Sequence, residues 1–271
     1  MTDQAPPFPA AQRWAEQLGE WGIPQEIVDQ APESPWIHDP QRFAVDHTID
    51  RDGTSARWGR EVLPPKGGTV LDIGCGGGRA SLALVPPATE LIGVDTSGAM
   101  LDRFIEATTA VARRTVHGAW PDVAGSTPTA DLAVCHHVAY NVADIVPFVW
   151  ALTGHARLAV VVELPVAHPM TAWAPAFQHF WGLARPTGPS ADDFLAALGE
   201  LGLDPEFVVS NRGPLSAAAS DPTVFVPTAR RRLCLSADRD DEIAAWLADN
   251  PPPFVERVAT VRWPGAAEPL V

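Results

Sequence analysis

The chain has 271 residues, 46% of them hydrophobic, which suits one α/β domain with additions or at most two domains. Its 19 Lys and Arg against 33 Asp and Glu give a formal net charge of −14, which disfavours nucleic acids and anionic membranes as partners. No apolar run of about eighteen residues occurs, and the N-terminus lacks the basic start and apolar stretch of a signal peptide, so we expect a cytoplasmic protein.

The N-terminal part of the chain is predicted to be helical. Trp14, Leu18 and Trp21 fall on one face of a helix, as core-packing side chains do. A proline-rich stretch around Trp36 breaks regular structure, and we interpret it as a loop or lid. Residues 1–50 are therefore expected to form a helical N-terminal and lid segment ahead of the main domain.

Short apolar strands alternate with helices through the middle of the chain. The expected strands cover residues 70–73, 91–94, 114–117, 131–135 and 158–163, and the expected helices cover 55–63, 79–85, 97–109 and 144–152. Such alternation predicts a Rossmann-like α/β fold, in which a doubly wound and mostly parallel sheet carries helices on both faces. An antiparallel edge strand is expected at 257–263, so that the main domain covers 51–271.

The pattern changes after the last of these parallel strands. Residues 165–189 carry Trp173, Phe177, Phe180 and Trp181 at spacings that gather them on one side of a helix. An insertion at this point lies next to the carboxyl ends of the strands, where open α/β sheets bind ligands. We therefore interpret it as a substrate lid within the main domain. Beyond it the sequence predicts a helix over 190–201, a strand over 206–210 and a mainly helical region over 223–250.

The most informative feature is the glycine-rich turn after the first strand, where four of the five residues 74–78 are glycine. Without Cβ atoms at this turn, a ligand can lie against backbone N–H groups at the start of the next helix. Asp95 ends the second strand about twenty residues later, where a carboxylate accepts hydrogen bonds from ribose hydroxyls. The alternative for Asp95 is an N-cap of the following helix. With the ribose contact, the predicted ligand is adenosine-like.

The spacing of the glycines excludes two other nucleotide sites. A dinucleotide fingerprint, G-x-G-x-x-G, counted from Gly74 would need glycine where Arg79 stands. A phosphate-binding loop needs Gly-Lys followed by Ser or Thr, and the chain has no such sequence. Neither pyrophosphate-binding pattern is present.

These segments resemble the class I S-adenosylmethionine-dependent methyltransferases: Val70 to Gly78 is similar to the first motif of that family, Gly93 to Asp95 to the second, and Asp131 to His137 to the fourth. The resemblance implies S-adenosylmethionine as cofactor, with its methionine end held by Asp72 and the glycine turn and its ribose held by Asp95. The residues that it places at the cofactor are Asp72, Gly74, Cys75, Gly76, Gly78, Asp95, Thr96, Ala119, Trp120 and His136.

The third motif departs from the family pattern. The strand that ends near His117 is followed by Ala119 and Trp120, where many members carry an acid close to the adenine. Trp120 or Asp122 would take the place of that acid.

The candidate catalytic residues follow the fourth strand. Methyl transfer is an in-line displacement, and a base is needed only where the acceptor must lose a proton. The resemblance implies that His136, His137, Tyr140 and Asn141 face the methionine end of the cofactor, and of two adjacent His in an extended chain only one points into the site. Either His is a candidate general base. The alternatives are that both His fix the backbone of the loop and that Tyr140 packs with its hydroxyl bonded.

The predicted acceptor is a small, partly apolar or aromatic molecule methylated on oxygen or nitrogen. Its candidate contacts are Trp36, Tyr140, Asn141, His168, Trp173 and Trp181. The Asn-Pro-Pro-aromatic motif of DNA amino methylation is absent, and neither the three dispersed cysteines nor the pair His168 and His179 predicts a metal site. A cofactor-binding regulatory or partner protein without transfer activity, and a methyltransferase acting on protein, stay open as alternatives.

Overall fold

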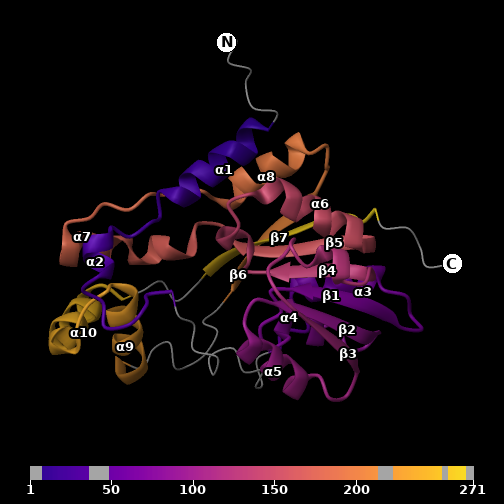
Figure 1. Cartoon of the computed structure of the whole chain (residues 1–271), viewed down its shortest axis with the longest axis horizontal. Helices are drawn as coiled ribbons and strands as arrows, with labels where there is room; N and C mark the ends of the chain where they lie inside the picture. Colours follow the sequence, from indigo (N-terminus) through magenta and orange to yellow (C-terminus); the bar gives the residue numbers. More distant parts are fainter. Residues whose placement is uncertain (1–7, 37–48, 213–221, 252–255, 267–271) are drawn as a thin grey trace, which may run out of the picture.

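The computed structural model describes residues 8–36, 49–212, 222–251 and 256–266. Within these residues one sheet runs through the molecule in the strand order β3-β2-β1-β4-β5-β7-β6 (Figure 1). The strands are β1 (Gly68–Ile73), β2 (Ala88–Asp95), β3 (Ala112–His117), β4 (Ala130–His136), β5 (Ala156–Pro165), β6 (Glu206–Arg212) and β7 (Glu256–Pro264). Strands β1 to β5 pair in parallel, whereas β7 pairs antiparallel with both β5 and β6. The Rossmann-like fold predicted from the sequence is confirmed.

Helices cover both faces of the sheet because its strands bury side chains on both sides. One face packs against α3 (Thr54–Val62), α4 (Arg79–Leu82) and α5 (Gly98–Ala107), which contribute Trp58, Leu82 and Phe104 to a shared core. The other packs against α1 (Pro9–Gly19), α6 (Ile145–His155) and α8 (Ala191–Glu200), which contribute Trp14, Phe148 and Phe194. No helix in the described ranges is both long and apolar enough to cross a bilayer.

Strand β7 lies inside the sheet, between β5 and β6, and the expectation that residues 257–263 form an edge strand is therefore wrong. The alternating sequence that suggested an edge is buried on both faces, because Ala259 and Val261 lie in the core and Val258 and Thr260 are also nearly inaccessible. The polar residues Arg257, Thr260 and Arg262 made the strand look half exposed. The antiparallel edge that the sequence predicts is present, but its strand is β6, which among the described residues pairs only with β7.

A separate helical cluster gathers α2 (Gln25–Val28), α7 (Ala174–Trp181), α9 (Pro222–Arg232) and α10 (Asp240–Asp249) on the left of Figure 1. Its core combines Trp21, which precedes α2, with Phe177 of α7, Ala229 of α9 and Ile243 of α10. The indole N–H of Trp21 donates to the carbonyl of Gly188 at 2.6 Å, which joins the N-terminal segment to the insertion. The insertion at 165–189 is thus one part of a cluster built from three chain segments.

Candidate functional site

The glycine turn has a backbone that only glycine adopts readily. Gly74, Gly76 and Gly78 have φ values of 67°, 50° and 86°. A Cβ atom on Gly74 would lie 2.3 Å from Cγ2 of Val138, so the close approach of the loop after β4 also requires glycine there. The N–H of Gly74 donates to the carbonyl of Val94 at 2.8 Å, which fastens the turn to β2.

Asp95 binds the turn directly. Its Oδ2 accepts from the N–H of Gly76 at 3.0 Å, and its Oδ1 accepts from the N–H of Ser97 at 2.8 Å. The N-cap of α5 is Ser97, so the alternative in which Asp95 caps that helix is wrong. Because a carboxylate offers about four acceptor positions, two remain for the hydroxyls of a ribose.

Asp72 lies beneath the turn and is 1% exposed. Its Oδ2 accepts from the hydroxyl of Ser81 at 2.7 Å and from the N–H of Ser81 at 3.3 Å, so it connects the end of β1 to α4. Burial raises the pKa of Asp72 to about 6, although the bonds from Ser81 work in the opposite direction. The neighbouring Cys75 is also buried, and burial raises the pKa of its thiol.

In the region predicted to hold the adenine, the end of β3 and the segment after it contact backbone carbonyl groups at the end of β2. Nε2 of His117 lies 2.9 Å from the carbonyl oxygen of the exposed Thr96, and the N–H of Gly118 donates to the carbonyl of Asp95 at 3.0 Å. Trp120 is 8% exposed and directs its indole N–H at the carbonyl of Phe148 in α6. Of the side chains considered for the adenine, that of Trp120 thus lies in the core, whereas Ala119 and Asp122 are exposed.

A cluster of polar side chains lies at the carboxyl ends of β4, β5 and β6, and we call it the Glu163 cluster. It consists of Glu163 with His136, His137, Arg212 and Ser55. Oε1 of Glu163 lies 2.6 Å from Nη2 of Arg212, 3.3 Å from Nε2 of His137 and 3.8 Å from Nδ1 of His136. The register of the sheet explains the cluster, because His136 pairs with Glu163 across β4 and β5.

Glu163 is ionised although it is 3% exposed. Burial alone would raise the pKa of its carboxyl group, but His136, His137 and Arg212 outweigh burial and lower that pKa to about 2. Glu163 and Arg212 are not among the residues predicted from the sequence. A single acid at the carboxyl end of the otherwise apolar strand Leu158 to Glu163 was the signal that could have identified the first of them.

The two adjacent histidines differ in their surroundings. Nε2 of His136 lies 2.6 Å from the hydroxyl of Ser55, and burial lowers the pKa of His136 to about 4, so this ring is neutral at pH 7. His137 has φ of 60°, a conformation uncommon outside glycine, and its side chain is 34% exposed. Nε2 of His137 also lies 3.1 Å from Nη1 of Arg212. His137 is therefore the more accessible of the two rings.

Tyr140 and His168 are packed together with the N-terminal segment. The ring of Tyr140 stacks on Trp14 at 5.3 Å between centroids, and its hydroxyl donates to the carbonyl of Pro165 at 2.8 Å. His168 stacks on Trp21 at 4.1 Å, and its Nδ1 accepts from the N–H of Met170. Both side chains join the core to the insertion, and the Tyr140 hydroxyl and Nδ1 of His168 already have hydrogen-bond partners.

The remaining candidate substrate-binding residues do not lie together in one site. Trp36 is 48% exposed, and Asn141 is exposed at the end of the short 3-10 helix Ala139–Asn141. Trp173 stacks on Phe225 at 5.6 Å, and the indole N–H of Trp181 donates to the carbonyl of Leu233 at 2.7 Å. The contacts of these last two Trp lie within the helical cluster.

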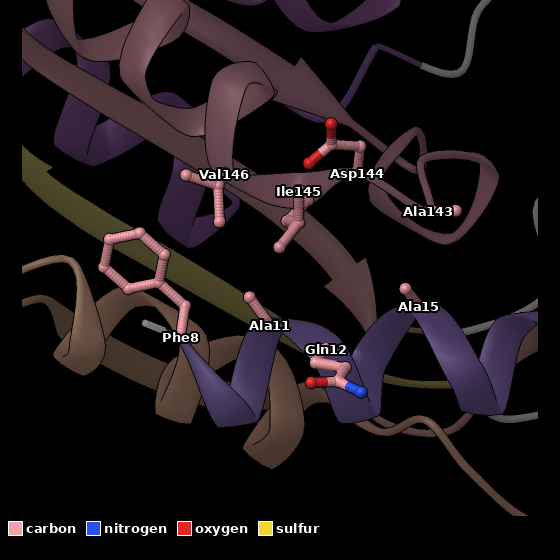
Figure 2. A pocket seen from close by; sticks show the side chains of 8 residues that line it. All are labelled: Phe8, Ala11, Gln12, Ala15, Ala143, Asp144, Ile145 and Val146. Carbon is pink, nitrogen blue, oxygen red and sulfur yellow. The ribbon is translucent and has the colours of Figure 1, made fainter. Parts of the chain in front are cut away.

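A groove of about 340 Å³ lies between α1 and the start of α6 (Figure 2). Figure 2 shows that the side chains lining it are mostly small or apolar and come from these two segments: Phe8, Ala11, Gln12, Ala15, Ala143, Asp144, Ile145 and Val146. None of them belongs to the glycine turn or to the Glu163 cluster, so this groove is distinct from the predicted cofactor site.

Comparisons with known proteins agree with the fold of the chain. Residues 70–157 match the family model described as a methyltransferase domain. A cyclopropane-fatty-acyl-phospholipid synthase-like protein from Lactobacillus casei superposes with a TM-score of 0.54 at 16% identity, covering 89% of this chain and 98% of its own. The YcgJ protein from Bacillus subtilis gives 0.51 at 17% identity, covering 79% and 98%.

Magnesium protoporphyrin IX methyltransferase from Synechocystis, solved with bound SAH, superposes with a TM-score of 0.50 at 14% identity, covering 96% of this chain and 100% of its own. These identities are low, and the superpositions show a shared fold. No protein with a curated functional description matches the sequence.

Proposed function

We propose that this chain is a class I S-adenosylmethionine-dependent methyltransferase and that it methylates an oxygen or nitrogen of a small, partly apolar or aromatic molecule. The match of residues 70–157 to the methyltransferase-domain family model supports the first part of this proposal. The observation that supports catalysis is the Glu163 cluster. In this cluster the partly exposed imidazole of His137 lies beside an ionised, buried carboxylate. The cluster lies at the carboxyl ends of the strands, where α/β folds bind ligands.

The cofactor is S-adenosylmethionine, which supplies an activated methyl group on sulfur. The residues of the site suit this cofactor. The glycine turn offers backbone N–H groups without Cβ atoms, and Asp95 keeps free acceptor positions for a ribose after binding Gly76 and Ser97. In our proposal Asp72 acts from beneath, by holding the turn and α4 together through Ser81.

His137 is proposed as the general base for an acceptor that must lose a proton. Its Nε2 faces both Glu163 and Arg212, and one nitrogen cannot donate to the carboxylate and accept from the guanidinium at the same time. When Nε2 carries the proton and donates to Glu163, Nδ1 has a free lone pair that can accept the proton of a hydroxyl or ammonium group. Glu163 would then stabilise the imidazolium that forms.

The charge of the chain supports a small substrate over a nucleic acid. A net charge of −14 repels a polyanion, and the one arginine-rich run, 230–232, has internal partners. Arg230 pairs with Asp240 at 2.6 Å, and Arg232 donates to the carbonyl of Pro35 at 2.7 Å. We also infer that the helical cluster, which includes the insertion at 165–189, acts as a lid together with the N-terminal segment, and that the protein works in the cytoplasm.

Binding and transfer assays test the proposal in two steps. Calorimetry should detect binding of S-adenosylmethionine and S-adenosylhomocysteine but no binding of NAD or ATP, because both pyrophosphate-binding patterns are absent. Transfer of a labelled methyl group is then measured against a panel of small phenols, carboxylates and amines, with a mixture of unmodified proteins as a parallel panel. Binding without transfer to any member would favour the regulatory alternative, and label only in proteins would favour a protein methyltransferase.

A further inference from the structure

The groove between α1 and the start of α6 has the size and the lining of a small-molecule site (Figure 2). Its volume of about 340 Å³ lies within the range of about 300–1,000 Å³ that is usual for ligand pockets. Its apolar side chains include Phe8, Ile145 and Val146. Because it shares no lining residue with the glycine turn or the Glu163 cluster, the groove is a second candidate site, independent of the proposed methyl transfer.

Two aromatic rings lie beside this groove. Phe8 lines it and contacts Trp150 edge-to-face, at 5.9 Å between the ring centroids. Trp150 comes one helical turn after Val146, so both side chains are on the same face of α6, and Trp150 is 54% exposed. Aromatic rings pack against apolar groups and also attract an ammonium ion.

The charged groups at the groove are acidic. Asp144 lines it, is exposed and stands at the N-cap of α6, but its side chain makes no capping hydrogen bond. Within the described part of the chain its carboxylate has no hydrogen-bond or ion-pair partner. The side-chain amide of Gln12 donates to Oε1 of Glu16 at 2.7 Å, which brings a second carboxylate beside the lining. No lysine or arginine is among the described residues that line the groove.

The two helix N-termini that meet at the groove offer few donors to an anion. At the start of α1, Oε2 of Glu200 already accepts from the N–H groups of Ala10 and Ala11, at 2.7 Å and 3.3 Å. In the first turn of α6, Pro147 has no N–H group. Free backbone N–H groups are what makes a helix N-terminus attract anions. The charge at this groove therefore favours a cation.

We propose that the groove binds a small organic ammonium ion that carries an apolar or aromatic group. The apolar group packs against Phe8, Ile145 and Val146, and the ammonium group pairs with the carboxylate of Asp144. A carboxylate ligand would instead be repelled by Asp144 and Glu16, and a neutral ligand would leave Asp144 without a partner.

An NMR titration of the ¹⁵N-labelled full chain tests the site, with S-adenosylhomocysteine present to occupy the predicted cofactor site. The probe is 2-phenylethylamine, compared with the neutral 2-phenylethanol and the anionic 3-phenylpropanoate. We expect amide shifts in residues 8–15 and 143–146. The amine should bind about 2–5-fold more tightly than the alcohol, as one exposed ion pair allows, and the carboxylate most weakly. No binding of the amine, shifts confined to other parts of the chain, or tightest binding of the carboxylate would overturn the proposal.

Two variants separate the effects of charge and shape. Asp144→Asn should remove the preference for the amine over the alcohol, and Asp102→Asn, which removes an exposed carboxylate from α5, is its matched control. Gln12→Trp should fill the groove and prevent binding of both ligands. Gln25→Trp, the same change at an exposed position of α2, should leave binding unchanged. Amine binding that survives Gln12→Trp, or a preference that survives Asp144→Asn, would contradict the proposal.

Discussion

His137 is held to Glu163 at two points. Its backbone N–H donates to the carbonyl of Glu163 at 2.7 Å, and its ring nitrogen Nε2 lies 3.3 Å from Oε1 of the same residue. The first contact holds His137 in a left-handed backbone conformation with φ of 60°, which costs on the order of 1 kcal/mol outside glycine. Strained conformations of this kind cluster at functional sites, and here the conformation aims the imidazole outward next to an ionised carboxylate.

Replacing each of the two histidines by alanine should separate their roles. We expect His137→Ala to lower turnover by ~10²–10⁴-fold with nearly unchanged affinity for S-adenosylmethionine, the range for a positioned acid–base group. His136→Ala should lower turnover much less, because this ring is engaged by Ser55 and is neutral already.

The measurement is steady-state kinetics with an acceptor found in the panel, together with calorimetry of cofactor binding. Near-normal turnover of His137→Ala across the pH range would show that positioning alone carries the reaction. A larger loss in His136→Ala than in His137→Ala would reverse the assignment of the base.

Replacing either partner of the ion pair in the Glu163 cluster should lower stability by a different amount. Arg212→Met leaves a buried carboxylate without its cation, which we expect to lower the free energy of unfolding by about 3 kcal/mol at pH 7. Glu163→Gln leaves Arg212 without its carboxylate, but Arg212 is more accessible and can be hydrated, so the free energy of unfolding should fall by less. The difference between Arg212→Met and the wild type should shrink in acid, because the unpaired carboxyl can then take a proton.

Urea unfolding of both single variants and of the double variant at pH 7 and pH 5 provides these free energies. The double variant Glu163→Gln/Arg212→Met should be more stable than Arg212→Met alone, since it buries no unpaired charge. Strictly additive losses would show that the two residues do not interact in solution.

The glycine turn and the two aspartates beside it could be located from the sequence because they are encoded locally, whereas their role in cofactor binding stays a prediction. The glycine turn, Asp72 and Asp95 lie within a short stretch of chain, and their residue types are dictated by backbone geometry and by the end of a strand. The parallel sheet followed from the alternation of apolar strands and helices for the same reason. The strand ends differed from expectation by only a few residues, as for β5, which extends to Pro165.

The rest of the site depends on contacts between distant segments, which a single sequence does not display. Glu163 and Arg212 meet only because β7 inserts between β5 and β6 and carries β6 parallel to β5. The aromatic residues of the insertion looked like substrate contacts, but Trp173 and Trp181 pack against α9 and the segment after it, which lie more than forty residues further along the chain. Aromatic spacing identifies a packed face without identifying its partner.

The contribution of Asp95 to cofactor binding can be measured directly. We expect Asp95→Ala to weaken S-adenosylmethionine binding by about 1.5–3 kcal/mol, the usual loss for hydrogen bonds to a charged acceptor. Asp102→Ala, on the exposed surface of α5, is the control and should bind as the wild type does. Titration calorimetry gives both affinities. An unchanged affinity of Asp95→Ala would mean that Asp95 serves only to hold Gly76 and Ser97.

The buried carboxyl of Asp72 should make the apo protein less stable as the pH rises. Its pKa is raised from 3.8 to about 6 on folding, so the folded state binds more protons than the unfolded state between these values. The contribution of this carboxyl group to the stability of the folded state is complete below pH 4 and is lost as the pH passes 6. At pH 7, the free energy of unfolding of Asp72→Asn should therefore exceed that of the wild type by up to about 3 kcal/mol, since the amide oxygen still accepts a hydrogen bond from Ser81.

Denaturant unfolding without cofactor, from pH 4 to pH 8, measures this dependence, and Asp131→Asn is the control with the opposite sign. Although burial opposes it, the bonds from Arg157 and Thr69 lower the pKa of Asp131, so that its carboxylate stabilises the fold at neutral pH and loses this effect in acid. Asp131→Asn should thus be less stable than the wild type at pH 7. If Asp72→Asn showed the same constant difference from the wild type at every pH, Asp72 would not change its proton occupancy on folding.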